Sequence, residues 1–144
     1  MGKDVIIALD LDSRSKALDF LDGFSNERPF VKIGMELYFA EGPAIVREIK
    51  SRGHKIFLDL KLHDIPNTVR RSMARLAELE VDMVNLHAAG GAAMMEAALE
   101  GLARPGGSRP LLIAVTQLTS ISQERMEREL LIARPLEQVV MPYA

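Results

Sequence analysis

Apolar residues along this chain gather in short runs, and the stretches between the runs carry apolar residues at helical spacing. Short runs rich in Val, Ile and Leu predict β-strands, whereas a spacing of three and four residues predicts a helix with one buried face. Because the two patterns alternate without interruption, we expect a parallel α/β fold. The predicted strands cover residues 5–9, 29–34, 55–61, 81–87 and 111–116.

The segments after the strands predict helices. Ala17, Leu18, Phe20 and Leu21 are expected on the inner face of the first helix. Residues 35–39 are expected to lead into the second helix, because Pro43 is well placed to open it. The first predicted helix follows a cap at Asp12 or Ser13, and the next two start at Pro43 and Pro66. The later predicted helices cover about residues 92–102 and 123–132, and a last helical segment starts at Pro135.

The first strand, residues 5–9, is apolar throughout, as expected of a parallel strand that is covered on both faces. The run from Phe57 to Thr68 differs, because charged residues alternate with leucines. Side chains of a strand alternate between its faces, so Asp59, Lys61 and His63 are expected on one face and the leucines on the other. Asp59 and Asp64 would then bracket the ammonium of Lys61 and keep it protonated, ready to donate a proton.

A simpler interpretation of these charges exists. Alternating charges often mark the solvated face of a strand, and Asp64 before Ile65-Pro66 is suited to cap a helix. Asp10, taken alone, is equally suited to cap the first helix. Residue types and spacing leave the catalytic and the structural interpretation open.

Polar residues fall repeatedly at the carboxyl ends of the predicted strands, which is where a TIM barrel places its chemistry. An open doubly wound sheet would instead gather its site at one switch point. A complete (β/α)8 barrel takes about 250 residues, whereas these 144 residues supply five βα units. We therefore expect residues 1–144 to be one domain, the N-terminal part of an incomplete barrel. The strand-end residues are Asp10, Lys32, Asp59, Lys61, His87 and residues 116–119.

Composition narrows the classes of function. A net charge of -2 gives no electrostatic case for binding nucleic acid, and without cysteine there is no thiolate chemistry and no disulfide. The apolar run at residues 5–9 is too short for a signal peptide or a membrane span. We expect a cytoplasmic protein that binds neither nucleic acid nor membrane.

The segment D-L-K-L-H-D-I-P-N-T at residues 59–68 resembles the signature of the orotidine 5'-phosphate decarboxylase family. Four further segments match it: I-A-L-D at 7–10, V-K-I-G-M-E at 31–36, N-L-H-A-A-G-G at 85–91 and A-V-T-Q-L-T-S at 114–120. Together they resemble the bacterial branch. The resemblance covers essentially the whole chain, but only the first five of the family's eight βα units.

The resemblance implies decarboxylation of orotidine 5'-monophosphate to UMP and CO2 in de novo pyrimidine biosynthesis, without a metal or other cofactor. Lys61 is then the general acid that protonates the ring carbon as CO2 leaves. Asp59 is implied to lie beside the substrate carboxylate. Lys32 belongs to the same charged network and touches the ribose, whose hydroxyls Asp10 holds.

The resemblance also implies a homodimer with shared active sites. Asp64, Ile65 and Thr68 are implied to reach into the active site of the second subunit, and Thr119 is implied to lie near the pyrimidine. His87 matches a common family residue, but we assign it no catalytic step and expect a hydrogen-bonded structural histidine.

The family segments that grip the substrate phosphate follow the sixth and eighth strands and have no counterpart in these residues. The glycine pairs at 90–91 and 106–107 are weak substitutes, and we expect the second pair on the face away from the chemistry. We therefore expect the chain to be a fragment of a longer protein.

Two alternatives stay open. Sugar-phosphate decarboxylases and aldolases related to 3-keto-gulonate 6-phosphate decarboxylase share the D-x-K-x-x-D strand but use magnesium. They carry an acidic residue at the second strand, where this chain has Lys32, and a lysine there repels the metal. The other alternative is a truncated, non-catalytic remnant, which the missing three units favour.

Overall fold

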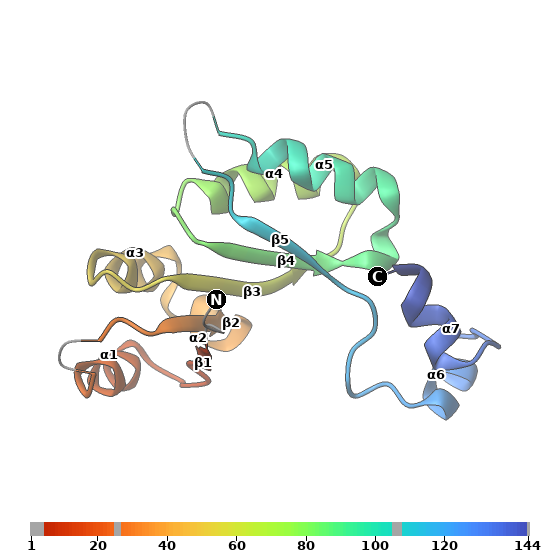
Figure 1. Cartoon of the computed structure of the whole chain (residues 1–144), viewed down its shortest axis with the longest axis horizontal. Helices are drawn as coiled ribbons and strands as arrows, with labels where there is room; N and C mark the ends of the chain where they lie inside the picture. The colour runs from red at the N-terminus through yellow and green to blue at the C-terminus, as the bar shows by residue number, and fades with distance from the viewer. Residues whose placement is uncertain (1–4, 25–26, 105–107, 144) are drawn as a thin grey trace.

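The predicted strands form a single parallel sheet with the order β1-β2-β3-β4-β5 (Figure 1). A computed structural model describes residues 5–24, 27–104 and 108–143. Each strand pairs with the next strand in the sequence, which is the arrangement of successive units in a (β/α)8 barrel. The strands are β1 (Ile6–Ala8), β2 (Phe30–Gly34), β3 (Ile56–Leu62), β4 (Met83–His87) and β5 (Leu111–Val115).

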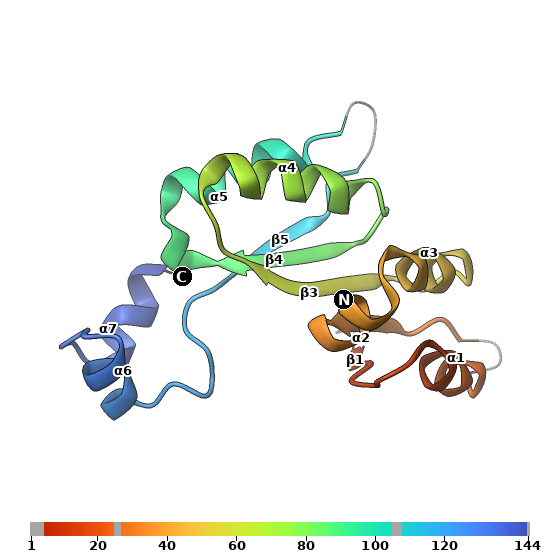
Figure 2. The same cartoon turned by 180° about the vertical axis from the view of Figure 1, so that it is seen from behind.

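Helices connect the strands and cover the sheet. Figures 1 and 2 show α4 and α5 over β3, β4 and β5, whereas α6 and α7 stand apart beyond the carboxyl end of β5. No helix in the described ranges is long and apolar enough to cross a membrane. The helices are α1 (Arg14–Asp22), α2 (Met35–Glu41), α3 (Pro43–Ser51), α4 (Pro66–Ala77), α5 (Ala92–Leu102), α6 (Gln123–Glu129) and α7 (Leu136–Val140), with short 3-10 turns η1 (Ala88–Gly90) and η2 (Met141–Tyr143).

The core lies between the inner strands and the helices. Ile33 of β2, Leu58 of β3 and Leu86 of β4 are fully buried. They pack with the apolar faces that helical spacing predicted, including Ile45 in α3 and Met73 in α4. Burying such a side chain stabilises the fold by about 1.5–3 kcal/mol. The core therefore fixes β2, β3 and β4 relative to one another.

Helices α4 and α5 approach each other closely at Gly101. A Cβ atom at this position would clash with the backbone oxygen of Arg70, so only glycine permits the observed contact.

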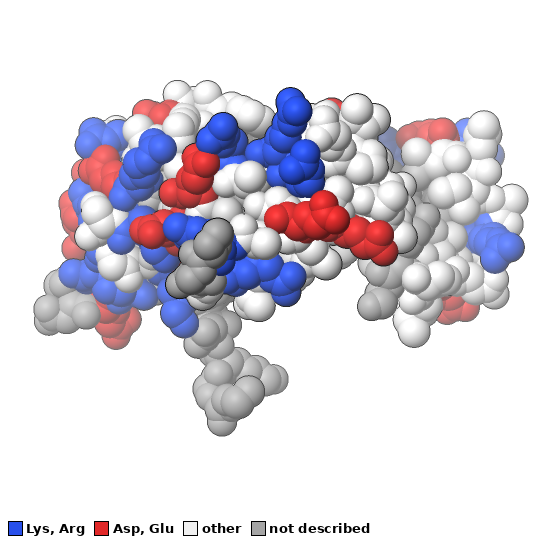
Figure 3. Space-filling model, turned by 90° about the horizontal axis from the view of Figure 1, so that it is seen from above, with Lys and Arg blue, Asp and Glu red and all other residues white. Residues whose placement is uncertain are grey.

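Lys and Arg side chains alternate with Asp and Glu across the face seen in Figure 3, without a continuous basic patch on that face.

The outer strands differ from the prediction. Val5 and Ile6 are 75% and 38% exposed, so the expectation that residues 5–9 are covered on both faces is wrong. Only Leu9 of this run is buried. The physical reason is position, because β1 and β5 each have one neighbouring strand in the described part of the chain. Leu111 of β5 is likewise 62% exposed.

Three helical details also differ. Residues 35–41 are themselves a helix, which ends where Gly42 takes a φ of 66° before Pro43 opens α3. Helix α6 ends at Glu129 rather than near residue 132, and Leu131 takes a φ of 58°. Phe20 is 43% exposed instead of facing the core, and its ring lies 5.4 Å from that of Phe24. The glycine pair expected at 106–107 lies outside the described residues.

Candidate functional site

Strand β3 carries an irregularity where the charged residues lie. Leu58 pairs with Val84 and Leu62 pairs with Leu86, so residues 59–61 of β3 oppose the single residue Asn85 of β4. Such a bulge bends a strand and is often found next to active sites. Leu60 and Leu62 pack against the same core as Leu58, but both are only partly buried.

Lys61 lies within this bulge and has a φ of 53°, a left-handed conformation that costs a non-glycine residue about 1–3 kcal/mol. Its backbone N–H donates a 2.8 Å hydrogen bond to the side-chain oxygen of Asn85. Residues held in this way by their surroundings cluster at functional sites, so the conformation itself marks Lys61 as a candidate.

Asp10, Lys32, Asp59 and Lys61 meet at the carboxyl ends of β1, β2 and β3, as their strand-end positions predicted. Lys61 Nζ lies 2.6 Å from Asp59 Oδ1, and Lys32 Nζ lies 3.6 Å from Asp59 Oδ2. Lys32 Nζ also lies 3.0 Å from Asp10 Oδ1. The four charges therefore alternate in sign along a chain of contacts, which we call the charge array. The contact with Lys32 argues against the interpretation of Asp10 as a simple helix cap.

The charge array lines a cavity of about 210 Å³. Asp59 is 9% exposed, whereas the Asp10 side chain is 73% exposed, so the array runs from the solvent into the protein. Met35 and Glu36, at the start of α2, complete one wall. Sequence reasoning assigned these two residues no part in the site, although they follow directly after β2.

Asp59 is held as a carboxylate. Burial raises its pKa, but hydrogen bonds from Lys61 and Asn85 and the positive charges of Lys61 and Lys32 outweigh burial and lower the pKa below 3.8. Both ammonium groups therefore lie beside a fixed negative charge at neutral pH.

Asn85 is the residue of this site that sequence reasoning missed. It is 3% exposed, and its side-chain nitrogen donates a 2.6 Å hydrogen bond to Asp59 Oδ1. A signal existed, because an amide between Val84 and Leu86 must lie buried and therefore needs hydrogen-bond partners.

The structure does not bring the remaining predicted residues to the array. Asp64, Ile65 and Thr68 are exposed at the start of α4, and Thr119 is exposed in a turn after β5. Asp64 Oδ1 accepts a hydrogen bond from the N–H of Ile65, and no ion pair joins it to Lys61 within the described chain. The expectation that Asp64 brackets Lys61 is therefore wrong for a single subunit.

His87 also differs from its prediction. No hydrogen bond reaches its ring from the residues that the structure describes, and its ring centre lies 5.5 Å from that of His63. Burial lowers the pKa of His87, and the positive charges of His63 and Lys61 lower it further. The lowered pKa favours the neutral form of the His87 ring at neutral pH.

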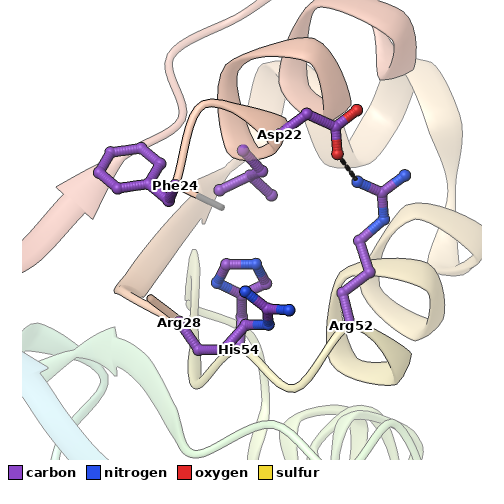
Figure 4. Close-up of a pocket in the computed structure, with 6 residues that line it drawn as sticks. Asp22, Phe24, Arg28, Arg52 and His54 are labelled. Atoms are coloured by element: carbon purple, nitrogen blue, oxygen red, sulfur yellow. Dashed lines mark hydrogen bonds and ion pairs between the residues drawn. The ribbon is translucent and has the colours of Figure 1, made fainter. Parts of the chain in front are cut away.

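A second cavity, of about 300 Å³, is lined by residues that include Asp22, Arg28, Arg52 and His54 (Figure 4). It lies at the amino ends of β2 and β3, opposite to the charge array, because Arg28 and His54 precede these strands. Asp22 lies 2.8 Å from Arg52, and His54 bonds to the backbone oxygen of Pro29. These polar groups therefore already have partners, and the cavity has no part in the array.

Comparisons with known proteins agree with the geometry. A protein from Geobacillus sp. (strain WCH70) named orotidine 5'-phosphate decarboxylase is 58% identical over 147 residues. The protein of the same name from Bacillus cytotoxicus is 56% identical. In both cases the match covers 100% of this chain and 62% of the relative. The chain thus spans less than two thirds of the length of these relatives.

Solved structures show the same fold. A crystal structure of an uncharacterized conserved protein from Geobacillus kaustophilus has a TM-score of 0.94 and 54% sequence identity to this chain. The match covers 96% of this chain and 66% of the Geobacillus kaustophilus chain. The crystal structure of orotidine 5'-phosphate decarboxylase from Lactobacillus acidophilus has a TM-score of 0.88 and 38% sequence identity to this chain. The match covers 99% of this chain and 66% of the Lactobacillus acidophilus chain. The five βα units are therefore part of a TIM barrel. Since the family model also matches residues 3–144, the chain belongs to the orotidine 5'-phosphate decarboxylase / HUMPS family.

Proposed function

We propose that residues 1–144 supply the proton donor and charge array of an enzyme that decarboxylates orotidine 5'-monophosphate to UMP and CO2. The observation that carries this proposal is the placement of Asp59 between two ammonium groups, with Lys61 Nζ at 2.6 Å and Lys32 Nζ at 3.6 Å. The relatives named orotidine 5'-phosphate decarboxylase support the choice of substrate.

In the proposed reaction the bond between the ring carbon and the carboxylate breaks, and CO2 leaves without the bonding electron pair. The pair stays on the ring carbon, where the Lys61 ammonium stabilises the developing negative charge. Lys61 then donates a proton to that carbon, and the resulting neutral amine regains a proton from water. Atoms and charge balance within these steps, with no oxidant or reductant.

Asp59 and the remaining members of the array have supporting roles in this proposal. Asp59 lies beside the substrate carboxylate, where like-charge repulsion disfavours the bound ground state. Lys32 offsets part of this negative charge and contacts the ribose. Asp10 is exposed at the outer end of the array, in a position suited to accept hydrogen bonds from the ribose hydroxyls.

We propose further that the complete enzyme is a homodimer with shared sites. Asp64, Ile65 and Thr68 are exposed on the side of β3 where the chain enters α4, and Ile65 is 67% exposed. An exposed apolar side chain between polar residues suits a subunit contact. Thr119 is proposed to approach the pyrimidine, from the turn after β5.

The test uses a fusion protein in which residues 1–144 replace the matching 62% of the Geobacillus sp. relative. The fusion protein supplies the part of the relative that the match does not cover. Loss of the absorbance of orotidine 5'-monophosphate, with CO2 release, is the expected result. A folded fusion protein without this activity would contradict the proposed function.

The same assay separates the magnesium-dependent alternative. Lys32 and Lys61 place positive charge on both sides of Asp59, where a divalent cation would be repelled. We expect equal rates with and without excess EDTA. A loss of activity that magnesium restores would move the assignment to the sugar-phosphate decarboxylases.

A further inference from the structure

We propose that Asn85 is a positioning residue, which holds Lys61 and Asp59 in their reactive arrangement without contacting the substrate. This inference rests on the proposed function for its kinetic consequences. Its structural basis is the pairing of one buried amide with both members of the proton-donating pair.

The orientation of the Asn85 amide is fixed by its two partners. The backbone N–H of Lys61 is a donor and therefore requires the amide oxygen, at 2.8 Å. The Asp59 carboxylate is an acceptor and requires the amide nitrogen, at 2.6 Å. A flipped amide would lose both bonds, so only one orientation fits.

The bulge explains why Lys61 needs this partner. Residues 59–61 oppose only Asn85, so the regular ladder between β3 and β4 is interrupted here. A bulge leaves backbone groups without their strand partner, and the Asn85 side chain satisfies the N–H of Lys61 instead. The left-handed conformation of Lys61 is thereby held from β4.

The second bond acts on the carboxylate. Asp59 Oδ1 accepts from both Asn85 and Lys61, which fixes the rotation of the carboxylate and aims this oxygen at the ammonium. Asn85 is 3% exposed and does not line the cavity of the array. Its loss should therefore lower kcat and leave KM nearly unchanged.

The test replaces Asn85 in the fusion protein by aspartate and by leucine. Asn85→Asp keeps the acceptor for the N–H of Lys61 but places a second carboxylate against Asp59. Two carboxylates this close share a proton, so the new group regains a donor as the pH falls. We expect kcat to fall about 100-fold at pH 9 and to recover partly towards pH 6. Asn85→Leu should lose a similar factor and recover at neither pH.

Gln138→Glu is the matched control, because it makes the same change from amide to carboxylate on an exposed helical residue. Its kcat should equal that of the parent at every pH. Parent-like kcat in both Asn85 variants would overturn the inference. The inference would also be overturned if kcat of the Asn85 variants fell equally at every pH and only in proportion to the loss of folded protein, measured by circular dichroism.

Crystal structures of the parent and of Asn85→Leu give a readout that is independent of activity. We expect the variant to lose the left-handed conformation of Lys61 or the contact between Lys61 Nζ and Asp59. An unchanged arrangement would overturn the inference. If the parent fusion protein has no decarboxylase activity, the proposed function fails, and these two structures still decide the role of Asn85.

Discussion

The carboxyl ends of β2, β3 and β4 contrast with the outer parts of the molecule. Asp59 is 9% exposed and contacts Lys32, Lys61 and Asn85. By comparison, Leu111 at the sheet edge and Leu131 after α6 are 62% and 83% exposed. The inner region satisfies its polar groups from neighbouring strands, whereas the outer region presents apolar side chains to the solvent.

This difference separates two requirements of the proposed enzyme. The charge array depends on neighbouring strands, and its four members and Asn85 all lie within residues 10–85. We expect stability to depend on covering the apolar surfaces that the described residues leave exposed. Four experiments test whether the two regions have these separate roles.

A polypeptide of only residues 1–144 should have negligible decarboxylase activity, at least about 10⁴-fold below that of the fusion protein. Remote binding groups of a substrate contribute to catalysis at the reacting centre, and residues 1–144 match only 62% of the length of the relative. Exposed apolar faces and open strand edges should also prevent a cooperative thermal melt. Near-normal turnover together with a cooperative melt would show that the inner region suffices by itself.

Lys61→Ala in the fusion protein should lower kcat by at least about 10³-fold, because it removes both the proton donor and the charge that stabilises the carbanion. Lys16→Ala is the matched control, since Lys16 is an exposed lysine near the start of α1 that pairs with Asp12 and does not belong to the charge array. Steady-state kinetics at saturating substrate measure the effect. A Lys61 variant within tenfold of the parent would remove this residue from the mechanism.

Mixing Asp64→Ala and Lys61→Ala subunits tests whether the exposed segment before α4 completes a partner's site. Random pairing of two inactive subunits should restore about a quarter of the parent sites, because half the dimers carry one intact site. The mixture is assayed after denaturation and refolding together. Heterodimers that form but stay inactive would contradict shared sites.

The smallest effect concerns pH and stability. The lowered pKa of His87 means that the unfolded chain takes up a proton near pH 6.5, before the folded chain does. The free energy of unfolding should therefore decrease as the pH falls below about 6.5, by less than about 1 kcal/mol for this partly exposed group. Urea titrations of the fusion protein and of its His87→Gln variant at pH 7.5 and 5.5 measure the difference.

Asp59 acts in a separate, more acidic range. Because its pKa is lowered below 3.8, its contribution to stability is fully present above pH 3.8 and is lost as the pH falls through the lowered value. A His87→Gln variant that loses stability between pH 7.5 and 5.5 as strongly as its parent would therefore assign the loss to a group other than His87 and Asp59.

Much of this architecture follows from the sequence, because hydrophobic periodicity depends on neighbours that are close along the chain. The alternation of strands and helices was predictable, and so was the meeting of Asp10, Lys32 and Asp59, since the carboxyl ends of parallel strands lie at one edge of a sheet. The exposure of β1 was not predictable, because an apolar strand has the same composition at an edge as at the centre.

The bulge at Lys61 had no local signal either. A positive φ usually indicates glycine or asparagine, whereas here a lysine takes it because a residue of another strand stabilises it. Asp64 forms a hydrogen bond with the N–H of its neighbour Ile65, and no ion pair joins it to Lys61 within the described chain. Spacing along the sequence alone cannot show which of these partners a side chain takes.

The dependence of Lys61 on Asn85 has a consequence for the order of folding. Their contact spans 24 residues, which is one βα unit, so a peptide that contains only β3 and the following turn lacks the partner that stabilises its conformation. During synthesis the array can form only after β4 has left the ribosome and docked. Lys61 thus acquires its backbone geometry when the strands dock, and its own local sequence does not supply it.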